Sequence, residues 1–187
     1  RDSEIKWAKD FLHDLGMSSF SPVAFNTGSG DRWKTKRWPM ESFLELGLML
    51  REDAGGRILL VGGPIEDEAN SLLATERPDL FVYPGVLELR RFIALLSRTR
   101  LIVTADTMAL HIGLGLQVPT VALFGSTSAP EIEAAGPLEK VVSPVDCICC
   151  YLKECDKQPF CMDVLTPEMV AKRIEEANWL TQPSMKD

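Results

Sequence analysis

The sequence has no long apolar run and no excess of positive charge, and these two absences exclude broad classes of protein. No apolar stretch approaches the roughly 20 residues that a membrane-spanning helix requires. The chain of 187 residues carries 20 Lys and Arg against 27 Asp and Glu, which gives a formal net charge of -7. Because contacts to nucleic-acid phosphates need clustered Lys and Arg, we expect no nucleic-acid partner.

The chain also lacks the common signatures of nucleotide binding. The segment Gly28-Ser29-Gly30 has no third glycine at the dinucleotide-binding spacing, and the sequence contains no P-loop and no Asp-x-Asp motif. The Gly28 loop keeps two interpretations, a flexible turn or a cradle whose amides hold a phosphate. Three cations follow in the same loop, namely Lys34, Lys36 and Arg37. Because a cationic loop in an acidic protein concentrates anions, we favour the phosphate interpretation.

What the sequence does contain is a regular alternation of short apolar runs with helical repeats. The predicted strands lie over residues 22–27, 57–61, 80–83, 101–105, 118–124 and 141–142. The predicted helices lie over residues 1–15, 39–50, 66–74, 87–98, 107–116 and from 166 onward. This alternation is typical of βαβ units. We therefore predict an α/β fold with a Rossmann-like open parallel sheet and helices on both faces.

A polar pair follows directly after the predicted strand over residues 101–105. Asp106 lies at its carboxyl end, and Thr107 can cap the next helix. His111 comes four residues after Thr107, so we expect the two side chains to share a helix face. Because ligands of open α/β sheets bind at the carboxyl ends of strands, these groups predict a binding site. Taken singly, Asp106 and His111 are equally compatible with capping and structural roles.

Five cysteines lie in one loop between residues 147 and 161. Four of them, Cys147, Cys150, Cys155 and Cys161, could supply thiolates to zinc or an iron–sulfur cluster, with Cys149 as an odd fifth. The downstream spacings are too short for a two-knuckle zinc ribbon, and disulfide bonds are a further alternative. Because nothing in the sequence reads as a signal peptide, we expect reduced thiols and a cytoplasmic location.

A more specific signal comes from five motifs spread over residues 22–177. They are Lys-Arg-Trp-Pro at residues 36–39, Leu-Val-Gly-Gly at 60–63, Asp106-Thr107 with His111, the segment 118–125, and the cysteine loop ending in Cys161-Met162. Together they resemble the carboxyl-terminal half of the bacterial heptosyltransferases, glycosyltransferase family 9. That resemblance implies one half of a GT-B enzyme, which transfers heptose from an ADP-sugar to the lipopolysaccharide core.

The resemblance also implies roles for individual residues. Lys36 matches a family lysine that holds the pyrophosphate of the sugar donor, and residues 106–111 match an Asp-Thr-Gly-x-x-His motif that contacts the diphosphate and the sugar. We expect the ADP-sugar to contact Thr27, Gly28, Lys36, Asp106, Thr107, Met108 and His111. A cation and helix-terminal amides would neutralise the departing ADP, so no metal and no other cofactor is expected.

Two departures from the family pattern qualify this expectation. Met108 stands where the family has glycine, so the backbone is less open to the sugar phosphate. The second departure is the absence of the half that supplies the general base and binds the lipopolysaccharide acceptor. We therefore expect the chain to be a fragment that binds the sugar donor but does not catalyse transfer. The alternative, motivated by Met108, is a nucleotide-binding or interaction module without transferase activity.

The same reasoning divides the chain into three parts. We expect residues 1–20 to form a linker helix from the missing domain and residues 21–144 to form the Rossmann-like nucleotide-sugar-binding domain. Residues 145–187 are expected to form the cysteine-rich loop and the closing helix of that domain. A peripheral association of the full-length protein with the inner membrane is left open.

Overall fold

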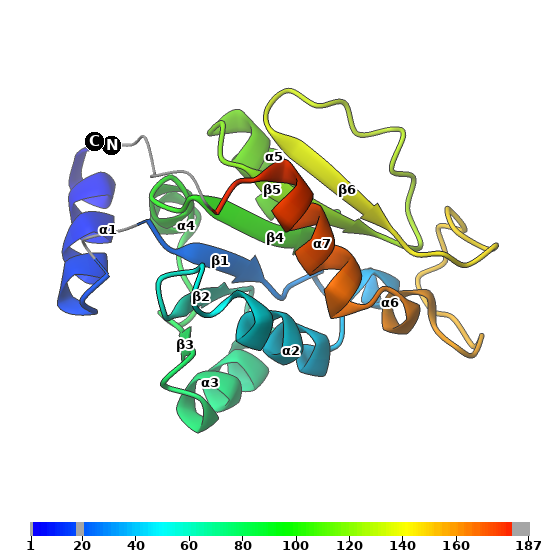
Figure 1. Ribbon diagram of the computed structural model, residues 1–187, viewed down its shortest axis with the longest axis horizontal. Helices are drawn as coiled ribbons and strands as arrows, with labels where there is room; N and C mark the ends of the chain where they lie inside the picture. The colour runs from blue at the N-terminus through cyan, green and yellow to red at the C-terminus, as the bar shows by residue number, and fades with distance from the viewer. Residues whose placement is uncertain (1, 18–20, 181–187) are drawn as a thin grey trace.

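A parallel sheet of six strands forms the centre of the computed structural model, which describes residues 2–17 and 21–180 (Figure 1). In chain order the strands are β1 (Val23–Asn26), β2 (Ile58–Val61), β3 (Phe81–Val82), β4 (Leu101–Ala105), β5 (Thr120–Phe124) and β6 (Leu138–Val142). Their spatial order is β3-β2-β1-β4-β5-β6, and all neighbouring pairs are parallel. The strand order thus reverses direction between β1 and β4, which is where open α/β sheets bind ligands.

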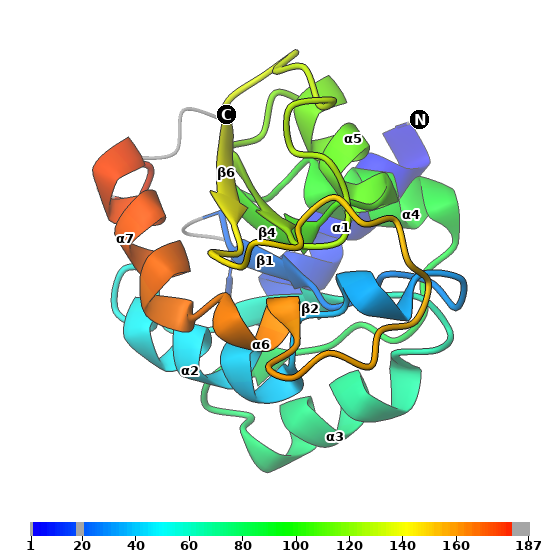
Figure 2. The same ribbon diagram turned by 90° about the vertical axis from the view of Figure 1, so that its right-hand side faces the viewer.

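Helices cover both faces of the sheet. One face carries α2 (Met40–Leu50), α3 (Asp67–Glu76) and α7 (Pro167–Ala177), and the other carries α4 (Leu89–Leu96) and α5 (Met108–Gly115). The first helix, α1 (Asp2–Asp14), packs against α4 at one end of the molecule (Figure 1). Figure 2 looks from the opposite end, with α6 and α7 in front and α1 behind the sheet. Two shorter elements are the 3-10 helix η1 (Lys34–Lys36) and the single turn α6 (Cys161–Val164). Over residues 2–17 and 21–180, no helix is both long and apolar enough to cross a bilayer.

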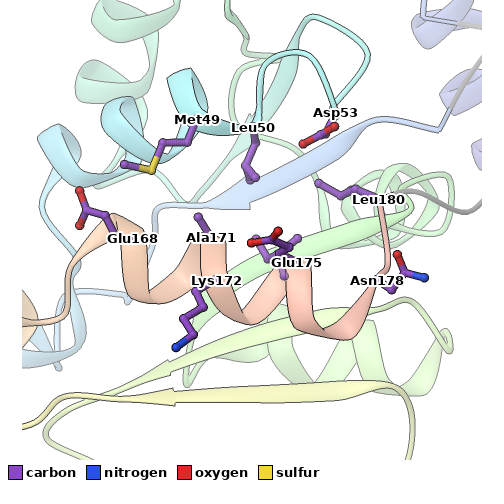
Figure 3. A pocket seen from close by; sticks show the side chains of 10 residues that line it. Met49, Leu50, Asp53, Glu168, Ala171, Lys172, Glu175, Asn178 and Leu180 are labelled. Carbon is purple, nitrogen blue, oxygen red and sulfur yellow. The ribbon is translucent and has the colours of Figure 1, made fainter.

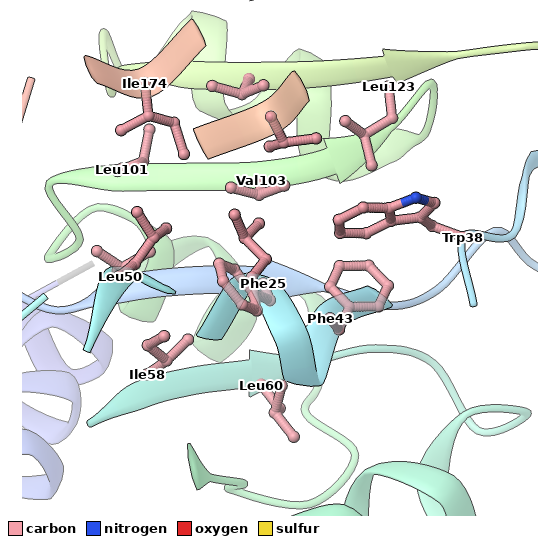
Figure 4. Packing of buried hydrophobic residues seen from close by; sticks show 14 of the residues in the cluster. Phe25, Trp38, Phe43, Leu50, Ile58, Leu60, Leu101, Val103, Leu123 and Ile174 are labelled. Atoms are coloured by element: carbon pink, nitrogen blue, oxygen red, sulfur yellow. The ribbon is translucent and has the colours of Figure 1, made fainter. Parts of the chain in front are cut away.

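The alternation of side chains along β1 builds a separate core on each face of the sheet. Phe25 packs in the cluster under α2 and α7, whereas Ala24 belongs to the cluster under α4 and α1. In the first cluster the ring centroids of Phe25 and Phe43 are 5.7 Å apart, and Trp38 meets Phe43 edge-on at 4.9 Å (Figure 4). The Trp38 indole donates a hydrogen bond of 2.7 Å to the Leu165 carbonyl, so this buried ring fastens the loop before α2 to the carboxyl-terminal part of the chain.

The predicted α/β fold is confirmed. Every predicted strand and helix forms, with bounds that differ by a few residues. β6 begins three residues earlier than the apolar pair 141–142 indicated, because Glu139 and Lys140 lie on a half-buried edge strand and interrupt the apolar pattern. Thr166 and Pro167 start α7 as predicted, since the Thr166 hydroxyl accepts a hydrogen bond from the Met169 amide. The three-part division of the chain at residues 20 and 144 stays a prediction.

Candidate functional site

A cavity of about 520 Å³ opens at the carboxyl ends of β1, β2 and β4, where the strand order reverses. Its polar side comes from the loops after those strands and from the first turn of α5. These polar-side residues are Asn26, Gly28, Ser29, Gly30, Trp33, Lys36, Gly62, Gly63, Glu66, Asp106 and Thr107. The opposite wall is apolar and comes from Pro64, Ile65, Val86, Leu87, Leu89, Phe92, Met108 and Ala109.

The centre of the polar side is an ion pair between two strand ends that are 70 residues apart in sequence. The Lys36 ammonium lies 2.9 Å from the Asp106 carboxylate and 2.9 Å from the Asp106 carbonyl. Both side chains are largely buried, at 14% and 17% exposure. The ammonium also lies 5.4 Å from the Trp33 ring centroid, within the range of a cation–π contact. The site therefore contains a partly desolvated cation whose position is set from two sides.

A network of hydroxyl and amide groups organises the adjacent start of α5. Thr107 is the N-cap of the helix, and its hydroxyl accepts a hydrogen bond from the Ala109 amide. The Asn26 side-chain amide donates to the Gly28 carbonyl at 3.0 Å and to the hydroxyls of Thr104 and Thr107. Because the first amides of a helix carry partial positive charge, this end of α5 favours an anion in the cavity.

Glu66 is a site residue that the sequence reasoning missed. It is 7% exposed, and its Oε2 accepts a hydrogen bond of 3.1 Å from the Gly63 amide. Its other oxygen, Oε1, has no hydrogen-bond partner among the described residues, and Arg37 stays 3.7 Å away. Glu66 thus places a largely buried carboxylate, paired with Arg37, at the wall of the cavity. The available signal was its place just after the carboxyl end of β2.

Glycine keeps the backbone close to Glu66 on both sides. A Cβ added at Gly28 would lie 3.0 Å from Glu66 Oε2, and one added at Gly62 would lie 2.9 Å from the Asn70 side chain. Larger residues at these positions would displace the groups that line the cavity. The glycines after β1 and β2 thus serve close packing of the two loops.

The apolar wall is unusual because much of it is open to solvent. Four of its large side chains are about half exposed: Ile65 at 49%, Val86 at 45%, Leu89 at 51% and Met108 at 57%. Exposed apolar side chains that gather at one cavity mark a ligand or partner contact rather than a scattered surface. The cavity therefore combines a charged side with a side suited to a flat or apolar group.

The structure brings together most, but not all, of the predicted site residues. Gly28, Lys36, Asp106, Thr107 and Met108 line the cavity. Thr27 does not, because strand alternation turns it to the other face, where its hydroxyl donates to Asn70 at 2.8 Å. His111 is exposed and does not line the cavity either. Thr107 has an extended backbone with φ of -141°, so the helical i, i+4 spacing does not apply from it.

The cysteine loop packs against the end of β5 rather than into the cavity. All five thiols are free, and the described residues contain no group of three or more His, Cys, Asp or Glu side chains that could hold a metal. The four-thiolate interpretation therefore has no support from the geometry. Burial, with a smaller contribution from neighbouring Cys150 and Cys155, raises the pKa of the Cys161 thiol to about 11.

A second hollow of about 680 Å³ lies between α2 and α7, on a different part of the molecule (Figure 3). It is larger, but its polar lining includes the carboxylates of Asp53, Glu168 and Glu175 with Lys172 as its cation. None of the predicted site residues lines it. A net negative lining repels anions, so we assign the anion site to the cavity at the strand ends.

Comparison with known proteins gives a consistent result. The sequence matches Glycosyltransferase family 9 (heptosyltransferase) over residues 8–160. It is 30% identical to Lipopolysaccharide heptosyltransferase 1 of Pseudomonas aeruginosa, over 78% of this chain and 45% of that protein.

Two solved structures share the fold. E. coli ADP-heptose lps heptosyltransferase II superposes with a TM-score of 0.71 at 18% identity, over 97% of this chain and 52% of that one. E. coli heptosyltransferase WaaC with ADP superposes with a TM-score of 0.68 at 25% identity, over 91% of this chain and 48% of that one. The chain spans about half the length of these relatives, or slightly less.

Proposed function

Because the chain belongs to glycosyltransferase family 9, the heptosyltransferase family, we propose that its cavity binds an ADP-sugar donor, ADP-heptose in the first instance. The observation that carries the proposal is Lys36, a partly buried cation at the carboxyl ends of the strands and beside the start of α5. An ammonium and helix-terminal amides at one point form a site for a diphosphate. The choice of ADP is supported by the solved relative E. coli heptosyltransferase WaaC, whose structure contains ADP.

The proposed transfer needs charge neutralisation at the leaving group. An acceptor hydroxyl oxygen would bond to the anomeric carbon while the bond from that carbon to the β-phosphate oxygen breaks, and ADP would leave with the electron pair. Lys36 and the first amides of α5 would stabilise the negative charge that develops on ADP. The proton of the acceptor hydroxyl would pass to a general base outside this chain. The scheme calls for no metal and no other cofactor.

The other groups of the cavity suit the remaining parts of an ADP-sugar. The apolar wall of Ile65, Val86, Leu89 and Met108 offers a surface for the adenine ring. The Glu66 carboxylate lines the cavity and would accept hydrogen bonds from ribose hydroxyls. Within the described part of the chain its Oε1 has an ion pair with Arg37 at 3.7 Å but no hydrogen bond. Asp106 would accept from hydroxyls of the transferred sugar while Lys36 turns to the phosphates. His111 and Thr27 have no direct role in this arrangement.

Because the chain spans about half of its relatives, the activity of the complete protein is part of the proposal. We infer that a further domain binds the lipopolysaccharide core acceptor and supplies the general base. In that case the isolated chain binds the sugar donor and does not catalyse transfer. We expect the complete protein to have a GT-B arrangement, of which this chain contributes one half. We also expect it to act in the cytoplasm.

Trp33 provides a direct test, because it lines the cavity beside Lys36. Titrating the chain with ADP should change its tryptophan fluorescence in a saturable way, and the variant Trp33→Phe should lose that change while calorimetry still detects ADP. Adenosine should bind more weakly, since it lacks the phosphates. If calorimetry shows no saturable ADP binding up to about 1 mM, where binding is only marginal, the proposed site is wrong.

Met108 favours a second candidate, a nucleotide-binding module without transferase activity. Its half-exposed side chain stands at the first turn of α5 and lines the cavity. The two candidates separate in the complete protein. Sugar transfer from ADP-heptose by the complete protein supports the transferase. If the complete protein binds ADP but transfers no sugar, and the variant Met108→Gly restores the transfer, then the Met108 side chain blocks the reaction.

A further inference from the structure

Thr35 occupies a buried position between the exposed Lys34 and the largely buried Lys36. It lies in η1 between Lys34 and Lys36 and is only 2% exposed. Its Oγ1 is 2.6 Å from the Leu152 carbonyl and 3.1 Å from the Ser126 hydroxyl. Because a hydroxyl has a single proton, Thr35 donates to the carbonyl and accepts from Ser126. A residue in the middle of the cationic loop is thus tied to two distant segments of the chain.

The geometry of η1 places Thr35 and Lys36 on different sides of the turn. The Lys36 ammonium lies 5.4 Å from the Trp33 ring centroid. Trp33 and Lys36 both line the cavity, whereas Thr35 points to the end of β5 and to the cysteine loop. The turn therefore has a ligand side and an anchored side.

The two hydrogen-bond partners of Thr35 belong to segments that are themselves held in place. The Tyr151 amide donates to the Ser126 carbonyl at 2.8 Å, and the Cys149 amide donates to the Gly125 carbonyl at 3.1 Å. The Tyr151 hydroxyl donates to Glu131 at 2.7 Å. The loop over residues 147–160 is therefore fastened to the segment after β5 at residues 149 and 151, directly before the Leu152 carbonyl that Thr35 uses. Lys34 adds an exposed contact of 3.4 Å to Glu154 in the same loop.

We propose that Thr35 is a positioning residue that fixes the backbone of Lys36. The loop over residues 147–160 then contributes to the diphosphate site indirectly, because it carries the Leu152 carbonyl to which Thr35 is hydrogen-bonded. Lys36 lies between two anchors, Thr35 on one side and the buried Trp38 on the other. With both anchors in place, the backbone of Lys36 is already ordered, so its side chain loses less conformational entropy when a ligand binds. The inference rests on the proposed function only in naming ADP as the ligand that Lys36 holds.

A double-mutant cycle tests the proposal in the whole chain, with ADP affinity measured by calorimetry. Thr35→Val keeps the shape of the side chain and removes the hydroxyl. It should weaken ADP binding by about threefold to tenfold, the range for losing one hydrogen bond. Lys36→Met removes the cation, and adding Thr35→Val to it should change ADP affinity no further. Thr35→Ser restores the hydroxyl and should restore most of the affinity.

Thr99→Val is the matched control, because Thr99 is also a buried threonine whose hydroxyl donates a hydrogen bond to a backbone carbonyl. That bond, of 2.8 Å to Leu96, lies just before the amino end of β4 and so at the opposite edge of the sheet from the cavity. Thr99→Val should lower the unfolding temperature as Thr35→Val does and leave ADP affinity unchanged. The positioning role would be overturned if Thr35→Val bound ADP with wild-type affinity. It would also be overturned if Thr35→Val weakened ADP binding equally in the wild type and in the Lys36→Met variant. A wild-type chain that binds no ADP would instead refute the proposed function.

Discussion

Replacing Lys36 by Met is the most informative single change, because it removes the cation of the site and keeps the apolar stem beside Trp33. In the unliganded chain the ammonium is shared between the Asp106 carboxylate and carbonyl, each at 2.9 Å. Removing it has two effects on a diphosphate. The ligand loses a charged hydrogen bond, and it must then approach an Asp106 carboxylate that no longer has a cation beside it.

The expected magnitude follows from these two effects. A hydrogen bond to a charged group contributes about 1.5 to 3 kcal/mol. A unit charge pair near 4 Å contributes up to about 4 kcal/mol at the effective dielectric constant of a protein surface. Because the two estimates overlap, we expect a loss of about 2 to 4 kcal/mol, or roughly 30-fold to 700-fold in the dissociation constant of ADP.

Calorimetric titration with ADP measures this loss, and Asp106→Asn supplies the opposite change. Without its carboxylate, residue 106 no longer competes with the phosphates for the ammonium, so ADP should bind more tightly than to the wild type. The ADP-sugar should gain less, because Asp106 is proposed to hold the sugar. If Lys36→Met binds ADP within about twofold of the wild type, a difference well under 1 kcal/mol, Lys36 does not hold the phosphates.

Three further predictions concern the glycine, carboxylate and thiol groups. Gly113→Ala should lower the free energy of unfolding by about 1 to 3 kcal/mol, because the new Cβ would lie 2.5 Å from the Thr120 hydroxyl. Gly115→Ala on the same helix meets open space and should be neutral or stabilising. Chemical denaturation measures both effects. Glu66→Gln should weaken adenosine binding by about 1 kcal/mol or more through the loss of a charged acceptor, with inorganic pyrophosphate unaffected, and equal losses for both would contradict the ribose role. The raised pKa values of Cys161, about 11, and Tyr83, about 12, disfavour their ionised forms in the folded chain. These two groups should therefore leave the free energy of unfolding unchanged up to about pH 9.0, the ordinary pKa of a thiol, and lower it as the pH rises further. For the same reason iodoacetamide at pH 8 should modify Cys161 more slowly than the exposed Cys150, as peptide mass analysis would show.

The sheet was predictable because its strands are buried on both faces and read as continuous apolar runs. Ile58–Val61 and Thr120–Phe124 are buried throughout, so their hydrophobicity alone marks them. β6 shows the limit of this signal. An edge strand with polar residues at Glu139 and Lys140 has no clean pattern, and its pairing with β5 depends on the rest of the fold.

The centre of the site was predictable for a topological reason. Lys36 and Asp106 follow neighbouring parallel strands, and the carboxyl ends of such strands meet at one edge of the sheet. Side-chain direction was harder to predict. Thr27 follows the parity of Phe25 and so points to α3, and His111 was counted from a capping residue that is not yet helical. Glu66 was missed because it lies five residues beyond the end of β2, and the sequence does not show that its side chain folds back to the Gly63 amide.

The packing of α1 against α4 links the first helix of the chain to the cavity wall. The Arg91 guanidinium of α4 lies 4.9 Å from the Trp7 ring centroid of α1, while Leu89 and Phe92 of the same helix form part of the cavity wall. α4 has eight residues and is about 12 Å long. One short helix therefore contacts α1 on one side and lines the cavity on the other, although no residue of α1 lines the cavity itself.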